Sequence, residues 1–171
     1  MYHSLDDIEL EASLIFCEFE VVMPALEFLT GTGRPPEAGV PLLLPLWLAV
    51  PLVSTTVSPE SSRTFASTRD PPTFNRTVLD TLRTDANEVD IRKESSVFIQ
   101  FGLFWSSLWD HQEIGEVIGT TVEYRMPSVY DRALSGANCS PKYDRLEQHL
   151  FRVTYSVVDD QRRWLARKMD Y

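Results

Sequence analysis

The sequence has little positive charge for its size. Its 16 lysines and arginines are outnumbered by 25 aspartates and glutamates, which gives a formal net charge of -9. A protein that grips nucleic acid by itself neutralises phosphates with clustered basic side chains, and no long basic run is present. We therefore expect contact with DNA to be indirect, through partners that supply the positive surface.

Cysteine and histidine are scarce. The two cysteines, Cys17 and Cys139, are too few and too far apart for a disulfide framework or a paired-cysteine metal motif. Such usage is typical of a reducing, intracellular compartment. The three histidines, His3, His111 and His149, lie in separate regions without metal-ligand spacing. We expect no metal, no cofactor and no small-molecule substrate.

A membrane span and an export signal are missing as well. The most apolar stretch, residues 40–53, is about 14 residues long and contains three prolines, whereas a membrane helix needs about 20 residues. Near the start, Asp6 and Asp7 stand where a secretory signal would have basic residues before an apolar run. These features predict an intracellular protein that does not enter a membrane.

The first part of the chain has the pattern of a small β-rich module. Apolar and acidic residues alternate from Ile15 to Val21, which predicts a half-buried strand. Glycines and prolines in residues 30–39 predict a loop, and a second strand is expected near Leu42–Leu44. We assign residues 1–44 to this module.

Residues 45–171 have the pattern of a helical domain with about five helices. The first should begin at Pro45 and end or bend early at Pro51, because proline lacks a backbone donor. Residues 54–69 are rich in serine and threonine, and they predict an exposed connection of which little need be ordered. The fold class is thus α+β, with helix dominant.

Apolar spacing predicts the remaining four helices. One should run from a cap at Asp70 to about Arg83, and the next should begin near Asn87. The apolar residues of this second helix cover nearly every side, which predicts a place at the middle of the core. Pro127 predicts a kink in the third helix, near Met126.

The last predicted helix is long and amphipathic. Its apolar stripe consists of Tyr143, Leu146, Leu150, Val153, Val157 and Trp164. Polar residues, among them Asp144 and Glu147, are assigned to its solvent side.

No arrangement of residues points strongly to catalysis. The chain has neither a nucleophile elbow nor a glycine-rich loop between a strand and a helix, and Cys17 belongs to the inward side of a strand, where thiols are usually inert. His111, Glu113 and Glu116 could offer metal ligands on one helical face, although acidic residues in a first turn also follow from the helix dipole. A small metal-dependent enzyme is therefore the alternative from another class.

The candidate partner contacts lie near the two ends of the chain. Asp6 and Asp7 make an acidic patch, and Trp164 lies beside Arg163 and Arg167. Tryptophan and arginine are enriched at protein interfaces. Burial of Trp164 in the protein's own core is the alternative.

One segment resembles a known signature. Residues 42–49, Leu-Leu-Leu-Pro-Leu-Trp-Leu-Ala, are similar to the Leu-Pro-Leu-Trp-Leu-Ala signature of GINS subunits, found where a sheet-rich module meets a helical domain. The signature residues here are Leu44, Pro45, Leu46, Trp47, Leu48 and Ala49. The opening with Tyr2 and Leu5–Ile8, and the later stretch Val89–Ile91, resemble the third GINS subunit. The second subunit, which shares the signature and the domain order, is the alternative within the family.

The resemblance implies a role. GINS is a heterotetramer, so three other GINS subunits are the implied partners. It acts in the nucleus, in initiation and elongation of DNA replication, where it joins the MCM helicase ring and its cell-division-cycle cofactor in the replicative helicase. This chain is then expected to be a non-catalytic structural subunit.

Overall fold

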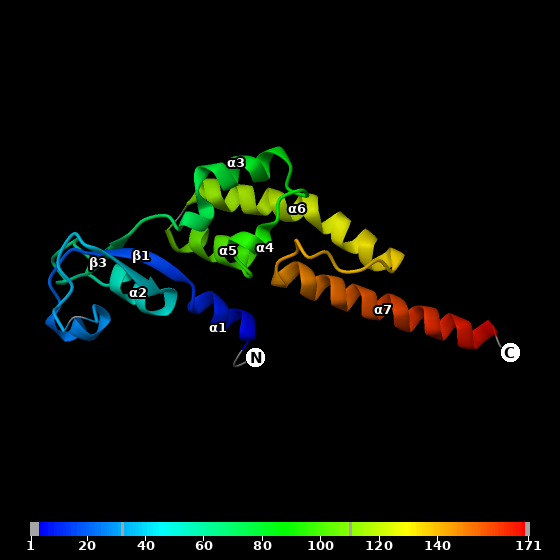
Figure 1. The fold of residues 1–171 in the computed structure, drawn as a ribbon, viewed down its shortest axis with the longest axis horizontal. Coiled ribbons are helices and arrows are strands. Elements are labelled where there is room, and N and C mark those ends of the chain that lie inside the picture. The colour runs from blue at the N-terminus through cyan, green and yellow to red at the C-terminus, as the bar shows by residue number, and fades with distance from the viewer. Residues whose placement is uncertain (1–3, 32, 110, 170–171) are drawn as a thin grey trace. The chain divides into compact units, whose positions relative to one another are not determined.

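The computed structural model describes residues 4–31, 33–109 and 111–169, and the chain forms two compact units, Met1–Pro72 and Thr73–Tyr171 (Figure 1). The first unit contains α1 (Leu5–Glu11), β1 (Leu14–Phe19), the 3-10 helix η1 (Pro24–Leu29), β2 (Pro41–Pro45), α2 (Leu46–Ser54) and β3 (Ala66–Thr68). After the 3-10 turn η2 (Pro72–Phe74), the second contains α3 (Arg76–Thr84), α4 (Ile91–Glu94), α5 (Phe98–Trp109), α6 (Gln112–Ser135) and α7 (Arg145–Met169). The α+β class is confirmed.

The sheet of the first unit is antiparallel, in the order β2-β1-β3. The two predicted strands are present as β1 and β2, with Ile15 opposite Leu44. Ile15, Cys17 and Phe19 are buried, whereas Leu14 and Phe16 on the other face are exposed. The alternation seen in the sequence thus defines one covered and one open face of the sheet.

Helix α2 packs against all three strands. It begins at Leu46, after Pro45 in the capping position, and continues through Pro51 to Ser54. Pro51 was predicted to end or bend the helix early, and the early end is wrong, because residues after Pro51 remain helical. Burial of Leu46 and Ala49 against the sheet outweighs the one hydrogen bond that Pro51 removes, because packing routinely overrides propensity.

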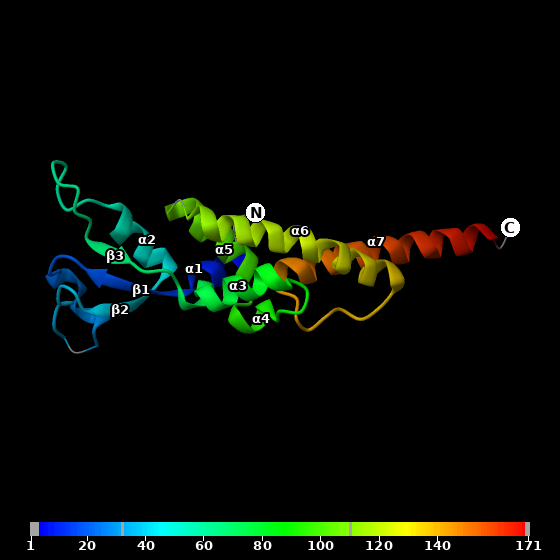
Figure 2. The ribbon, with the colours of Figure 1, turned by 90° about the horizontal axis from the view of Figure 1, so that it is seen from above.

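Residues 54–69 are better ordered than their composition predicts. Thr56 and Thr64 form a β-bridge, and β3 pairs with β1 (Figure 2). Ion pairs join Arg69 to Glu18 and Arg63 to Glu20. The boundary between the two compact units consequently falls after Pro72, while the expected module boundary after Leu44 lies inside the first unit.

In the second unit, α3 starts later than predicted. Its cap is Asn75, whose side-chain oxygen accepts a hydrogen bond from the Val78 N–H at 2.9 Å. Asp70 is not the cap, because the turn η2 follows the two prolines at 71 and 72 before the helix begins. Leu79 and Leu82 of α3 are buried.

The helix predicted from Asn87 is two helices, α4 and α5. Ser95 between them has an extended backbone, and its hydroxyl accepts a hydrogen bond from the Val97 N–H at 3.3 Å. Such local bonds compete with the helix. Nor is α5 enclosed on nearly every side: Phe98, Ile99, Phe101 and Trp105 are buried, but Leu103, Phe104 and Leu108 are exposed.

The two longest helices lie side by side. Helix α6 continues as one element through Pro127 and ends at Gly136, which has a φ of 76°. The Gly136 N–H donates to the Ala133 carbonyl oxygen and the Ala137 N–H donates to the Arg132 carbonyl oxygen, and these two hydrogen bonds close the last turn. The predicted closing helix is confirmed as α7. It packs along α6 and extends beyond its end (Figures 1 and 2).

We predict that Gly102→Ala destabilises the second unit. An added Cβ would lie 2.6 Å from Ile118 Cγ1 and 2.9 Å from its Cδ1, so the α5–α6 contact must open. We expect a loss of about 1 to 3 kcal/mol in the free energy of unfolding, measured by chemical denaturation. Gly119→Ala is the matched control: its Cβ would meet nothing within 4 Å, so it should raise stability by about 0.5 to 1 kcal/mol. Equal gains in both variants would contradict the prediction.

Candidate functional site

A buried ion pair holds the second unit together. Arg125 of α6 and Glu147 of α7 are exposed by only 1% and 0%, and the guanidinium binds the carboxylate with two bonds, Nε–Oε1 at 2.6 Å and Nη2–Oε2 at 3.0 Å. The Arg125 Nη1 also donates to the carbonyl oxygens of Ala86 at 2.5 Å and Val89 at 3.0 Å. One side chain thus connects α6, α7 and the loop before α4.

Asp144 extends this network to the start of α5. Its Oδ1 accepts a hydrogen bond from the Glu147 N–H at 3.0 Å, and its own N–H donates to Glu147 Oε2 at 3.1 Å, which makes a reciprocal cap of α7. Its Oδ2 accepts a bond from the Ile99 N–H at 3.1 Å. Burial raises the pKa of Asp144 to about 6, although the hydrogen bonds from Glu147 and Ile99 act in the opposite direction.

The assignment of Asp144 and Glu147 to the solvent side of the last helix is therefore wrong. Both side chains are buried, because each has polar partners inside the unit. The Asp-x-x-Glu spacing of a capping box was present in the sequence and would have indicated the start of α7. Nothing local indicated that Arg125 is buried, since its partners are up to 39 residues away.

The candidate partner contacts lie on two units. Asp6 is half-buried and Asp7 is exposed on α1 of the first unit, and Trp164, Arg163 and Arg167 are exposed on α7 of the second. Trp164 is 57% exposed and does not belong to the core of this chain. Arg163 binds Asp159 one turn earlier, at 2.8 Å.

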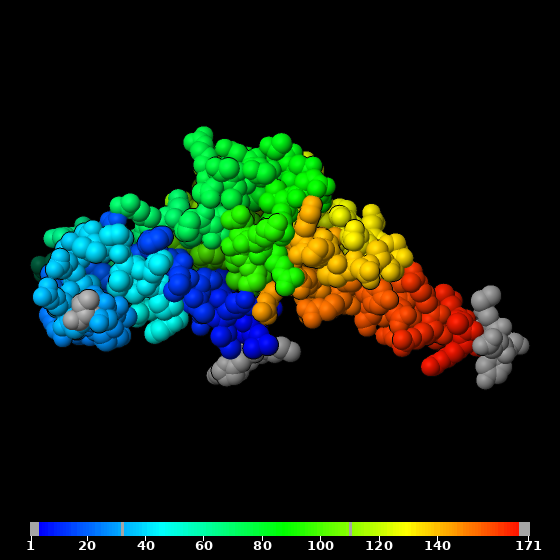
Figure 3. Space-filling model, viewed as in Figure 1, coloured from blue at the N-terminus to red at the C-terminus, as the bar shows by residue number. Residues whose placement is uncertain are grey.

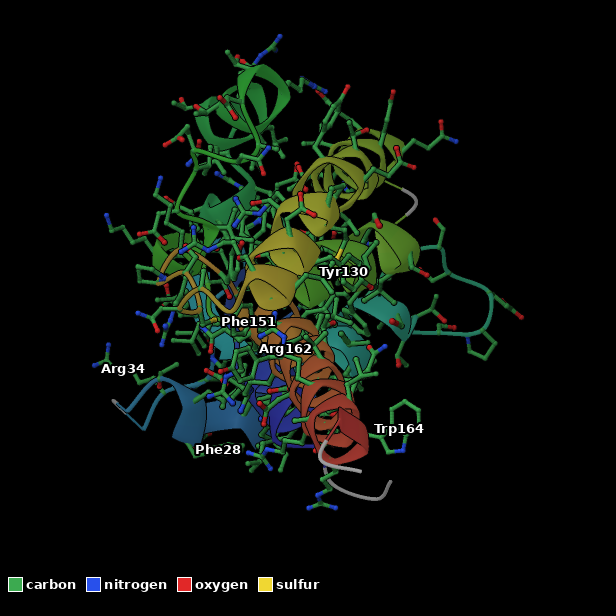
Figure 4. The ribbon with its side chains drawn as sticks, turned by 90° about the vertical axis from the view of Figure 1, so that its right-hand side faces the viewer. Phe28, Arg34, Tyr130, Phe151, Arg162 and Trp164 are labelled. Atoms are coloured by element: carbon green, nitrogen blue, oxygen red, sulfur yellow. The ribbon has the colours of Figure 1, made fainter. Side chains whose placement is uncertain are left out.

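The predicted apolar stripe of α7 is covered only in its first part. Tyr143 is buried and Leu150 packs against the cluster of Val129, Ala133, Tyr143 and Phe151. Further along, Val153, Val157 and Trp164 are exposed by 49%, 61% and 57%. We call these three residues the α7 outer stripe. Figure 4 shows Trp164 pointing away from Tyr130 and Phe151, and the face in Figure 3 leaves this half of α7 uncovered.

A shallow groove of about 330 Å³ accompanies the outer stripe. It is lined by His149, Arg152, Val153, Ser156 and Val157. Apolar and basic side chains therefore share one face of α7. This combination suits an amphipathic partner with acidic residues beside its apolar ones.

The signature segment has a divided role in the first unit. Leu44, Leu46 and Ala49 are buried, Pro45 and Leu48 are half-buried, and Trp47 is 58% exposed. Beside it, the open face of the sheet presents Leu14, Phe16 and Leu43, with Phe16 directly opposite Leu43. Part of the signature thus stabilises the fold, and part of it stays at the surface.

The alternative of a metal-dependent enzyme gains no support from the geometry. Glu113 binds Arg83 at 2.8 Å. Within residues 4–31, 33–109 and 111–169, no group of three His, Cys, Asp or Glu side chains could hold a metal ion. His3 and Tyr2 lie outside the described residues. In the same described ranges, none of the helices combines the length and apolar character that crossing a bilayer requires.

These observations define a class of protein: a two-unit α+β chain with a buried polar network in its second unit and with exposed apolar side chains on both units. The sequence is similar to the DNA replication complex GINS protein PSF3 of three fungi. Identity is 27% with the Debaryomyces hansenii protein, covering 96% of this chain and 97% of that one, and 29% with the Phaeosphaeria nodorum protein, covering 96% of each. For Saccharomyces cerevisiae it is 23%, covering 98% and 99%.

The predicted resemblance to the third GINS subunit is thereby confirmed over nearly the whole chain. A comparison with family models gives no match.

We predict that single substitutions in the buried pair are strongly destabilising. Arg125→Met leaves the buried Glu147 carboxylate without its counter-charge, and Glu147→Gln does the same to the Arg125 guanidinium, so each should lower the free energy of unfolding by about 3 to 5 kcal/mol. The double variant should lose less than the sum of the two. Arg83→Met, which breaks an exposed pair with Glu113, is the control and should change stability little. Additive losses in chemical denaturation would contradict the coupling.

Asp144 should give the stability a distinctive dependence on pH. Between about pH 4 and 6 the folded state keeps a proton on Asp144 that the unfolded state has lost, so this group contributes more stability as the pH falls. The difference in free energy of unfolding between the wild type and Asp144→Asn, measured at pH 7 and pH 4, should shift in favour of the wild type by up to about 3 kcal/mol at the lower pH. Parallel pH profiles would show that the Asp144 pKa is ordinary.

Proposed function

We propose that this chain is the third subunit of a GINS heterotetramer and acts as a structural subunit without catalysis of its own. The observation that carries the proposal is the similarity over nearly the full length to proteins named as a DNA replication complex subunit. The order of a sheet-containing unit followed by a helical unit agrees with it. The relatives carry the name of the third subunit, which favours it over the second.

The proposed place of action is the nucleus, in initiation and elongation of DNA replication. There the tetramer joins the MCM helicase ring and its cell-division-cycle cofactor in the replicative helicase. With a net charge of -9, this chain contacts DNA only indirectly. It needs no cofactor for such a role.

The proposed partner surface in the second unit is the α7 outer stripe, together with Arg163 and Arg167. Exposed valine and tryptophan side chains lose unfavourable contact with water when another subunit covers them. Asp6 and Asp7 form the proposed acidic contact of the first unit. The mechanism is linkage: surfaces that are completed only in the assembled state stabilise that state by their association free energy.

Co-expression with the other three GINS subunits of the same organism tests the proposal. We expect one species that contains the four chains in equal number, identified by size exclusion with mass determination. A stable monomer that does not bind the other three chains would contradict the proposal.

Trp164→Ala extends the test to the outer stripe. Because Trp164 is exposed, the variant should fold as the wild type does, while removal of an interface anchor should weaken assembly by at least about tenfold. Phe28→Ala is the matched control, since Phe28 is an aromatic residue 71% exposed on η1, which does not belong to the outer stripe. Equal effects of both variants on assembly would assign the partner surface elsewhere.

A further inference from the structure

Helices α3 and α6 pack against each other in the second unit (Figure 1), and a groove of about 340 Å³ lies between them. It overlaps a second recess of about 250 Å³, with which it shares Leu82, Arg83, Thr120 and Tyr124. Together the two recesses are bounded by residues 82–87 on one side and by residues 116–124 of α6 on the other. We call them the α3–α6 groove. It contains none of the residues assigned to the outer stripe or to the acidic contact of the first unit.

The floor of the groove is apolar. Leu82 of α3, Val117 of α6 and Ala86 are buried residues that border it. Tyr124 borders both recesses and is 66% exposed, so its ring is free to cover a ligand. An apolar floor beside an exposed aromatic ring is the surface on which an apolar side chain of a ligand packs.

Thr121 brings an unused hydroxyl group to this floor. Its side chain is 1% exposed and forms no hydrogen bond with a described residue, whereas the neighbouring Thr120 donates to a carbonyl oxygen of α6 at 2.8 Å. Among the described residues, the buried side-chain oxygens that lack both a partner and contact with solvent belong to Asp90, Gln100 and Tyr143. The Thr121 oxygen is not one of them, so it keeps access to solvent through the groove that it borders. A ligand in the groove can donate to this hydroxyl or accept from it.

The walls of the groove are acidic. Arg83 is the basic residue of the lining, and two carboxylates already bind it, Glu113 at 2.8 Å and Asp80 at 3.1 Å. Glu116 and Asp85 also line the groove, and neither forms an ion pair with a lysine or arginine of the described residues. A positive group on the ligand would complement these two carboxylates.

We propose that the α3–α6 groove binds a short segment of a partner protein that carries an apolar side chain and, within about four residues of it, a lysine or an arginine. The apolar side chain packs on Leu82 beside the Tyr124 ring, the backbone of the segment forms a hydrogen bond with the Thr121 hydroxyl, and the basic group pairs with Glu116. Glu116 and Tyr124 are eight positions apart on α6, which is about 12 Å and matches about four extended residues. Two connected recesses along this length suit a chain segment better than a compact molecule.

A phage-displayed library of random peptides is the probe, selected on the immobilised full chain. Phage that also bind the double variant Glu116→Lys/Tyr124→Ala are removed first; both side chains are exposed, so this variant should fold as the wild type does. We expect the remaining peptides to combine a basic and an apolar residue at the spacing given above. The affinity of one such peptide, labelled with a fluorophore, should fall at least about threefold from low to high salt, because the pairing is partly electrostatic.

Three single variants test the assigned contacts with the labelled peptide, by fluorescence polarisation. Thr121→Val keeps the shape of the side chain and removes the hydroxyl, so affinity should fall at least about fivefold. Its melting temperature should not fall, because the hydroxyl has no partner within the described chain. Tyr124→Ala and Glu116→Gln should each weaken binding by at least about fivefold as well.

Matched controls lie on the same helix. Tyr130→Ala and Glu123→Gln change exposed residues of α6 outside the groove and should leave the affinity within about twofold of the wild type. Trp164→Ala should also leave it unchanged, so a loss of peptide binding is distinguishable from a loss of subunit assembly. A library that yields no peptide after the removal step, peptides that are acidic, or binding that survives both Thr121→Val and Glu116→Gln would overturn the proposal.

Discussion

The buried pair of Arg125 and Glu147 sets the arrangement of the second unit. A charged side chain of 1% exposure loses its hydration, and only a full set of partners offsets that cost. Arg125 finds them in one carboxylate and in the carbonyls of Ala86 and Val89, which fixes the loop before α4. Glu147 at the same time caps α7 together with Asp144, so the start of the last helix depends on the same contact.

Much of the fold could be predicted because its signals are local. The alternation in β1, the second strand and the long α7 follow from periodicity in neighbouring residues. Errors arose where a local side-chain bond or a tertiary contact decided the outcome: Ser95 separates α4 from α5, Asn75 replaces Asp70 as a cap, and the sheet retains α2 beyond Pro51. Periodicity indicates which side of a helix is polar, but it does not identify the residues that a polar side chain contacts. It therefore could not reveal the burial of Arg125.

The candidate partner surface was also predicted only in part from the sequence. Sequence pattern placed Trp164 on the stripe of α7, and the structure shows that the stripe leaves the covered part of the unit after Leu150. The helix continues beyond the end of α6 (Figure 1), and Val157 and Trp164 on it are 61% and 57% exposed. Apolar surface of this kind favours association, which is the behaviour proposed for a subunit of a complex.

The arginines of this chain differ in whether they form ion pairs, although their chemistry is the same. Where a carboxylate is within reach, as for Arg83 or Arg125, the charge is neutralised within the chain. Arg92, Arg132 and Arg152 bind no carboxylate of the described residues, but all three are exposed, so water hydrates their guanidinium groups and the fold bears little cost.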